Sequence, residues 1–163
     1  MRALLAFGLA ALVAAPAAAR PAQTFAPPGA RLALELPHGW HTTRPDHGWR
    51  FEAIGPGYSG WVFLSVVRAT VTNRSFQRSF VAFERSATKR LGPHVIFRSR
   101  RTTIGSEPAV EIYAAARATN TELVYGFQHA GLEYILAYAT TTSRFAEVRP
   151  SFAASAGSVR FLD

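Results

Sequence analysis

The chain has 163 residues, a formal net charge of +8 from 18 basic and 10 acidic residues, and no cysteine. The missing cysteine excludes disulfide bonds and a lipid-modified N-terminal cysteine, so an exported form must depend on its hydrophobic core for stability. The positive charge favours anionic partners such as lipid headgroups, nucleic acid or an acidic protein, although an arginine-rich surface is also an ordinary feature of some proteomes.

The N-terminal segment 1–19, MRALLAFGLAALVAAPAAA, predicts a secretory signal peptide. It has Arg2, an apolar run over residues 3–15, and small residues at Ala17 and Ala19, which predicts cleavage after Ala19. The run is too short for a transmembrane segment. Loss of Arg2 would leave a net charge of +7. We therefore expect a periplasmic or secreted protein from a Gram-negative bacterium, with no transmembrane segment.

Residues 20–29 are rich in proline and alanine and predict a linker, whereas residues 30–163 predict a single domain. Alternation of apolar and polar residues with period two predicts strands in this domain. Before the middle of the chain these strands lie at 31–37, 49–54 and 60–70, and after it at 94–104, 107–118, 122–128 and 133–141.

Two segments have the helical period instead. In residues 75–93 an apolar stripe is followed by the stop signal Gly92-Pro93. In residues 142–161 apolar residues recur at helical spacing, but Pro150 lies among them, so this helix is expected to be kinked or to begin late. The blocks of strands and helices predict an α+β fold, with a twisted antiparallel sheet flanked by two main helices. The apolar stripe of the first helix comprises Phe76, Phe80, Phe83, Ala87 and Leu91.

The order of several loose motifs resembles the PsbP-like fold family, which contains PsbP and DcrB-like exported bacterial proteins. The motifs are LALELPHGW, IGSEPAVEIY, GLEYILAYAT and the closing SVRF, and the resemblance covers residues 31–161. It implies a twisted antiparallel sheet between helices and a non-catalytic binding or accessory role. It does not select a partner, because a fold does not fix a function.

The stretch PHGWHTTRPDHGW, residues 37–49, permits two interpretations. If residues 40–43 and 49–52 pair as a hairpin, His41 and His47 come within side-chain reach with Asp46 beside them, and two histidines with a carboxylate suit zinc or copper(II). Alternatively the stretch forms two ordinary turns that deliver tryptophans to the core, and Arg44 and Arg50 would repel a cation. The candidate metal ligands are His38, His41, Asp46 and His47.

Basic residues form the other candidate site. Four of them, one immediately before the predicted helix 75–93 and three within it, fall within about 60° around the helix axis, opposite the apolar stripe. Three more follow on the next strand. This pattern predicts a positive face that docks to an acidic protein or an anionic envelope surface, with a solvated outer face as the alternative. Nucleic acid is disfavoured by the compartment and by the lack of aromatic residues among the arginines. The predicted partner-binding residues are Arg74, Arg78, Arg85, Lys89, Arg98, Arg100 and Arg101.

Two further motifs have ordinary explanations. GPGYSG at 55–60 has the glycine spacing of a dinucleotide-binding loop, but a predicted strand follows it instead of a helix, so we interpret it as a hairpin loop. Gly-Trp occurs three times, at Trp40, Trp49 and Trp61. These tryptophans are either core anchors or, if exposed on one edge, a surface that stacks on glycans.

The sequence gives little support for catalysis, since it contains no cysteine nucleophile, no closely spaced carboxylate pair and no nucleophile-elbow serine. Three hypotheses follow. The first is a non-catalytic periplasmic binding protein that uses its basic helix face and no cofactor. The second is a zinc- or copper-binding module built on the histidines. The third is an enzyme with a site assembled across the sheet.

Overall fold

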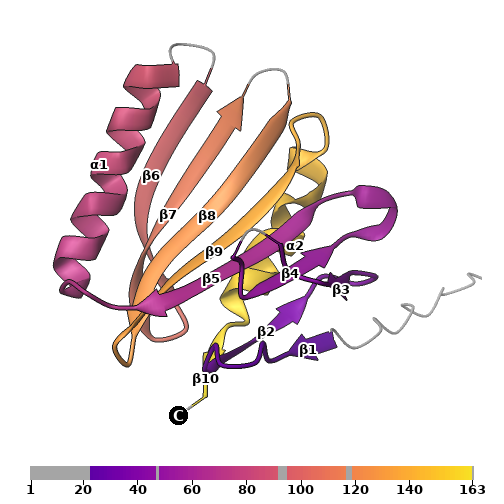
Figure 1. Ribbon diagram of the computed structural model, residues 1–163. Coiled ribbons are helices and arrows are strands. Elements are labelled where there is room, and N and C mark those ends of the chain that lie inside the picture. The colour runs from indigo at the N-terminus through magenta and orange to yellow at the C-terminus, as the bar shows by residue number, and fades with distance from the viewer. Residues whose placement is uncertain (1–22, 47, 92–94, 117–118, 163) are drawn as a thin grey trace, which may run out of the picture.

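The computed structural model describes residues 23–46, 48–91, 95–116 and 119–162, with side chains in these ranges except at 83–91, 95–97 and 116. A seven-stranded sheet has the order β3-β4-β5-β9-β8-β7-β6, and a three-stranded sheet has the order β1-β2-β10 (Figure 1). All pairs in both sheets are antiparallel. The strands are β1 (Gln23–Phe25), β2 (Leu32–Leu36), β3 (His41–Thr43), β4 (Phe51–Ile54), β5 (Trp61–Arg68), β6 (Val95–Ile104), β7 (Glu107–Ala116), β8 (Asn120–His129), β9 (Leu132–Thr141) and β10 (Arg160–Phe161), and the helices are α1 (Asn73–Leu91) and α2 (Phe145–Gly157).

The two helices cover opposite faces of the large sheet. In β8, Leu123 pairs with Tyr138 of β9, and Tyr138 stacks on Phe152 of α2 with ring centroids 5.1 Å apart. Gly126, three residues further along β8, lies on the other face, where a Cβ atom would stand 2.9 Å from the Phe80 ring of α1. Side chains alternate along a strand, so each helix contacts a different set of residues. The α+β arrangement predicted from the sequence is confirmed.

The main hydrophobic core lies between the large sheet, α2 and β2. Leu32, Leu34 and Leu36 of β2 are at most 1% exposed, as the alternation predicted, and the strand ends immediately before Pro37. Trp40 closes one end of this core by packing edge-on against Phe152 at 5.8 Å. Burial of these large side chains supplies the main driving force for docking α2 and the small sheet.

A chain of hydrogen bonds runs through the same layer. The Tyr138 hydroxyl of β9 donates to Ser155 Oγ of α2 at 3.0 Å, and Ser155 Oγ donates to the Glu35 carbonyl of β2 at 2.6 Å. The Glu35 amide in turn donates to Ser158 Oγ at 2.7 Å. The large sheet, the helix and the small sheet are therefore joined by polar contacts at one place inside an apolar core.

Helix α1 is fixed to the opposite face by local and distant contacts. Thr72 caps its first turn, because its Oγ1 accepts a hydrogen bond from the Ser75 amide at 3.3 Å. Gln77 Nε2 donates to the Pro108 carbonyl at the start of β7 at 3.1 Å. The ring of Phe80 fits over the bare backbone of Gly126. These contacts set which side of α1 faces β6.

Three local expectations differ from the structure. Residues 23–25, within the expected linker, form β1 and pair with β2, a long-range contact that composition does not reveal. Of the two alternatives for the second helix, the late start is wrong, because α2 begins at Phe145 and contains Pro150. The segment ends in β10, where Arg160 pairs with Ala33 of β2, instead of continuing as helix.

We expect Phe152→Ala to lower the free energy of unfolding by about 3–5 kcal/mol, because this fully buried ring contacts both Trp40 and Tyr138. Urea unfolding followed by tryptophan fluorescence would measure the change. The matched control is Val71→Ala, at a side chain 47% exposed, which should change stability by less than about 0.5 kcal/mol. Similar effects of the two substitutions would contradict this account of the core.

Candidate functional site

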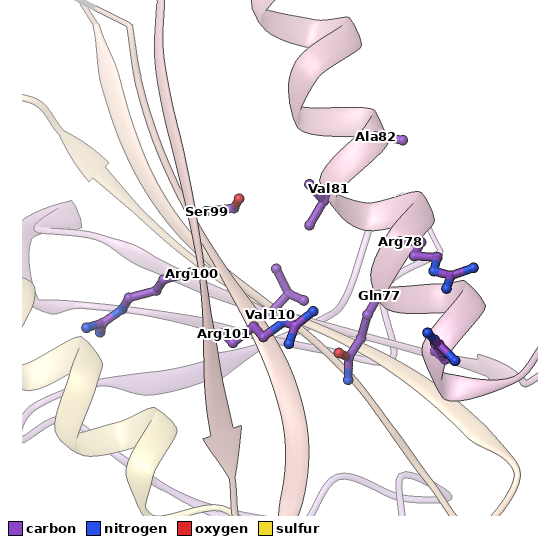
Figure 2. A pocket seen from close by; sticks show the side chains of 9 residues that line it. Gln77, Arg78, Val81, Ala82, Ser99, Arg100, Arg101 and Val110 are labelled. Carbon is purple, nitrogen blue, oxygen red and sulfur yellow. The ribbon is translucent and has the colours of Figure 1, made fainter.

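Arginines of α1 and β6 border an open groove on the α1 face of the sheet. Arg74 and Arg78 are exposed on α1, and Arg101 is exposed on β6. The groove has a volume of about 540 Å³. Figure 2 shows the side chain of Arg101 on the same side of the sheet as Gln77 of α1. We call this surface the helix groove, and it is lined by Arg74, Gln77, Arg78, Val81, Ala82, Ser99, Arg100, Arg101 and Val110. Arg100 borders it from β6, although its guanidinium pairs with Glu111.

The groove combines positive charge with an apolar floor. Val81 of α1 and Val110 of β7 lie between the cationic side chains. Within the part of the chain that the structure describes, Arg74, Arg78 and Arg101 have no carboxylate partner. No described carboxylate neutralises these charges, and the groove is electrostatically suited to an anion.

The predicted basic set does not form one face. On β6, Arg98 pairs with Tyr113 and Arg100 with Glu111, so both side chains lie on the α2 face, whereas Arg101 faces α1. Figure 2 shows Arg100 pointing away from α1. The expectation that all three strand arginines join the helix arginines is thus wrong for Arg98 and Arg100, because successive side chains of a strand alternate. The side chains of Arg85 and Lys89 lie outside the described residues.

Arg98 and Arg100 instead line a second cavity, between β6, β7, β8 and the start of α2. Its volume is about 740 Å³. Apolar and aromatic side chains form much of its wall, and Tyr113 packs on Phe145 with ring centroids 5.2 Å apart. We call it the aromatic pocket, and it is lined by Arg98, Ser99, Arg100, Glu111, Tyr113, Leu123, Phe145, Ala146, Arg149 and Pro150.

A buried acid is held in the wall of the aromatic pocket. Glu111 is 6% exposed and accepts two hydrogen bonds from Arg100, at 2.6 Å from Nε and 2.7 Å from Nη2. These contacts raise the pKa of the Arg100 guanidinium. Burial raises the pKa of the Tyr125 hydroxyl, and the charge of Glu111 and a hydrogen bond with it raise this pKa further. The negative charge of Glu111 is therefore balanced by Arg100, as a buried charge requires.

The histidine-rich stretch is not gathered into a metal site within the described residues. His41 pairs with Ile54, not with residues 49–52, and this register places it at the end of the hairpin remote from the loop that carries Asp46. His38 and His41 are exposed, and His47 lies outside the described residues. Strand β4 starts at Phe51, two residues later than expected. Trp49 precedes it and packs on Phe63 with ring centroids 5.2 Å apart.

The glycine motif and the tryptophans have structural roles. Residues 55–60 join β4 to β5 as a hairpin loop, and the Gly55 amide donates to the Gly60 carbonyl at 2.9 Å, which confirms that interpretation. Trp40 is 7% exposed and anchors the core. Trp49 and Trp61 are half-buried. The three tryptophans therefore do not form an exposed platform for glycans.

Sequence reasoning missed the aromatic pocket. Its signal was present in β7, where Glu111 interrupts the apolar run EPAVEIY on the face it shares with Tyr113. An acid on an otherwise apolar strand face requires a partner. The partner, Arg100, and the wall residue Arg149 come from elements that only the fold brings together.

Solved structures with the same fold were found, although no protein-family model matches this chain and no curated protein matches it in sequence. Cyanobacterial PsbP (CyanoP) from Synechocystis sp. PCC 6803 has a TM-score of 0.64 at 10% identity, covering 92% of this chain and 98% of that one. LpqN of Mycobacterium tuberculosis, described as involved in cell envelope biogenesis, has a TM-score of 0.63 at 8% identity, covering 90% and 88%. The Ran-binding protein Mog1p of Saccharomyces cerevisiae has a TM-score of 0.58 at 6% identity, covering 89% and 97%. The chain has the PsbP-like fold.

Within the described residues, no helix combines the length and apolar character needed to cross a membrane.

We expect replacement of Tyr125 and Tyr138 by phenylalanine to reduce the loss of stability at alkaline pH. Burial raises the pKa of both hydroxyls above the usual 10.0, so their contribution to stability is complete below that value and is lost as the pH rises above it. The free energy of unfolding, measured at about pH 8 and about pH 11, should fall less in the double variant than in the unmodified chain.

Lys89, the only lysine, and the three other tyrosines are the same in both proteins, so the comparison isolates Tyr125 and Tyr138. Tyr134, whose pKa burial also raises, is present in both proteins and serves as an internal reference. An equal fall in the two proteins would contradict the burial of these hydroxyls.

Proposed function

We propose that this chain is an exported, non-catalytic binding protein that holds an acidic segment of a partner protein in the helix groove. Three cations without a carboxylate partner among the described residues, Arg74, Arg78 and Arg101, surround a groove with an apolar floor, and this observation carries the proposal. The predicted signal peptide supports the export.

The shape of the groove favours a protein segment over a membrane surface. The space lies between a helix and the edge of a sheet, and its apolar lining includes Val110, which is buried, and Val81, which is partly buried. A flat bilayer contacts protruding side chains, whereas an extended acidic segment can reach both the cations and the floor. Burial of apolar atoms between charges adds affinity that charge alone does not give.

Structures with this fold support a binding role in general terms. One of them is described as Ran-binding and another as involved in cell envelope biogenesis. Neither description identifies the partner here, because the proteins share the fold at 6% and 8% identity. The partner is identified by chemistry alone, as an acidic segment with small apolar residues between its carboxylates.

We expect the triple variant Arg74→Gln, Arg78→Gln, Arg101→Gln to bind an acidic peptide at least about tenfold more weakly than the unmodified chain. The probe is a fluorescein-labelled peptide of alternating glutamate and alanine, about ten residues long, followed by fluorescence anisotropy. Added salt should weaken binding to the unmodified chain, since the contacts are partly solvent-exposed ion pairs.

Two controls separate this site from bulk charge. Arg44→Gln, Arg68→Gln, Arg160→Gln removes the same charge at exposed positions outside the groove and should leave peptide affinity unchanged. A peptide of alternating glutamine and alanine should not bind. Equal peptide binding by both triple variants would overturn the proposal. Groove-dependent binding to phosphatidylglycerol vesicles without peptide binding would replace the proposed partner by a membrane.

A further inference from the structure

The aromatic pocket has the composition of a small-molecule site and lies on the other face of the sheet from the helix groove, with Ser99 and Arg100 of β6 bordering both. Its volume of about 740 Å³ falls within the range of ligand pockets in proteins, roughly 300–1,000 Å³. Such pockets combine a mainly apolar wall with a few polar groups that fix orientation. Here Tyr113, Leu123 and Phe145 supply the apolar wall, and the arginines supply the polar groups.

The charge of the pocket is positive after its internal ion pair is counted. Arg100 and Glu111 neutralise each other through two hydrogen bonds. The remaining cations, Arg98 and Arg149, come from β6 and α2 and have no acidic partner within the described residues. Because the one acid in the wall is already engaged, it does not repel an incoming anion as a free carboxylate would. The guanidinium group matches a carboxylate in shape and forms paired hydrogen bonds with it.

The apolar wall indicates the rest of the ligand. The rings of Tyr113 and Phe145 are inclined by 60° to each other, and both border the pocket. An aromatic ring of a ligand beside this pair packs against one of the two rings by its face or its edge, and this geometry adds binding free energy beyond that of apolar burial. The pocket also lies at the first turns of α2, where the partial positive charge of a helix N-terminus favours an anion.

We propose that the aromatic pocket binds a small aromatic carboxylate, with the carboxylate between Arg98 and Arg149 and the ring against Tyr113 and Phe145. The inference does not depend on the helix groove, since it uses different side chains on the opposite face of the sheet.

The test compares phenylacetate with its uncharged isostere phenylacetamide and with acetate, which lacks the ring. Binding to the purified chain is followed by backbone amide chemical shifts. Phenylacetate should bind at least about tenfold more tightly than either analogue, because it alone satisfies both the arginines and the rings. The shifts it perturbs should include the amides of Leu123, Ala146 and Arg149, which line the pocket.

Variants locate the two halves of the site. Arg98→Gln and Arg149→Gln should each weaken phenylacetate about tenfold and leave the weak binding of phenylacetamide unchanged. Tyr113→Leu keeps an apolar wall but removes a ring, and should weaken phenylacetate without affecting acetate. Arg74→Gln with Arg78→Gln removes two charges from the helix groove and should have no effect. Unfolding curves check that each variant is folded.

Three results would overturn the inference. They are equal affinities for phenylacetate and phenylacetamide, shift changes confined to residues outside the pocket, and octanoate binding as tightly as phenylacetate. The last result would assign the pocket to aliphatic anions instead. Because the helix-groove variant is the control here, failure of this test leaves the proposed function intact, and failure of the peptide test leaves this inference intact.

Discussion

The contact among Tyr138, Ser155 and Glu35 is the constraint on which the rest of the structure depends. It joins the large sheet, α2 and the small sheet within a mainly apolar core. Apolar packing tolerates small slips, whereas a buried hydroxyl without a partner costs about 1–3 kcal/mol. The hydrogen bonds therefore fix the rotation and the position of α2 along the sheet. That position in turn determines where Phe145 and Arg149 stand relative to β6, and so determines the aromatic pocket.

The edge strand β6 carries arginines on both faces of the large sheet. Arg101 faces α1, while Arg98 and Arg100 face α2. A basic segment that looks continuous in the sequence thus supplies two surfaces with different chemistry. On one face three arginines border a groove with a small apolar floor, and on the other an ion pair and two aromatic rings line a larger cavity. Arg100 and Ser99 border both cavities, but the Arg100 guanidinium is engaged by Glu111, so the free cations of the two faces are different residues.

Much of this fold could be predicted from local sequence, because the strand and helix periods are strong in residues 31–37, 75–93 and 122–141. Contacts between distant segments could not. Strand β1 exists because Gln23–Phe25 pairs with β2, and residues 20–29 carry no alternation that signals it. The position of His41 depends on the β3–β4 register, in which His41 pairs with Ile54. The faces of Arg98 and Arg101, in contrast, follow from simple alternation and were within reach of the sequence. The pairing of Arg100 with Glu111 required the β6–β7 register.

The edge position of β6 has a consequence for self-association. Strand β6 is a ten-residue strand whose outer side pairs with no other strand within the described residues, and such an edge is a template on which a second copy could add its own edge strand. Such pairing would bring guanidinium groups of two copies into opposition along the joined edges, and like charges opposite one another destabilise strand pairs. The other edge, β3, has only three residues and offers little to a neighbouring chain. The arginines of the two proposed sites thus also oppose polymerisation of the protein through the sheet.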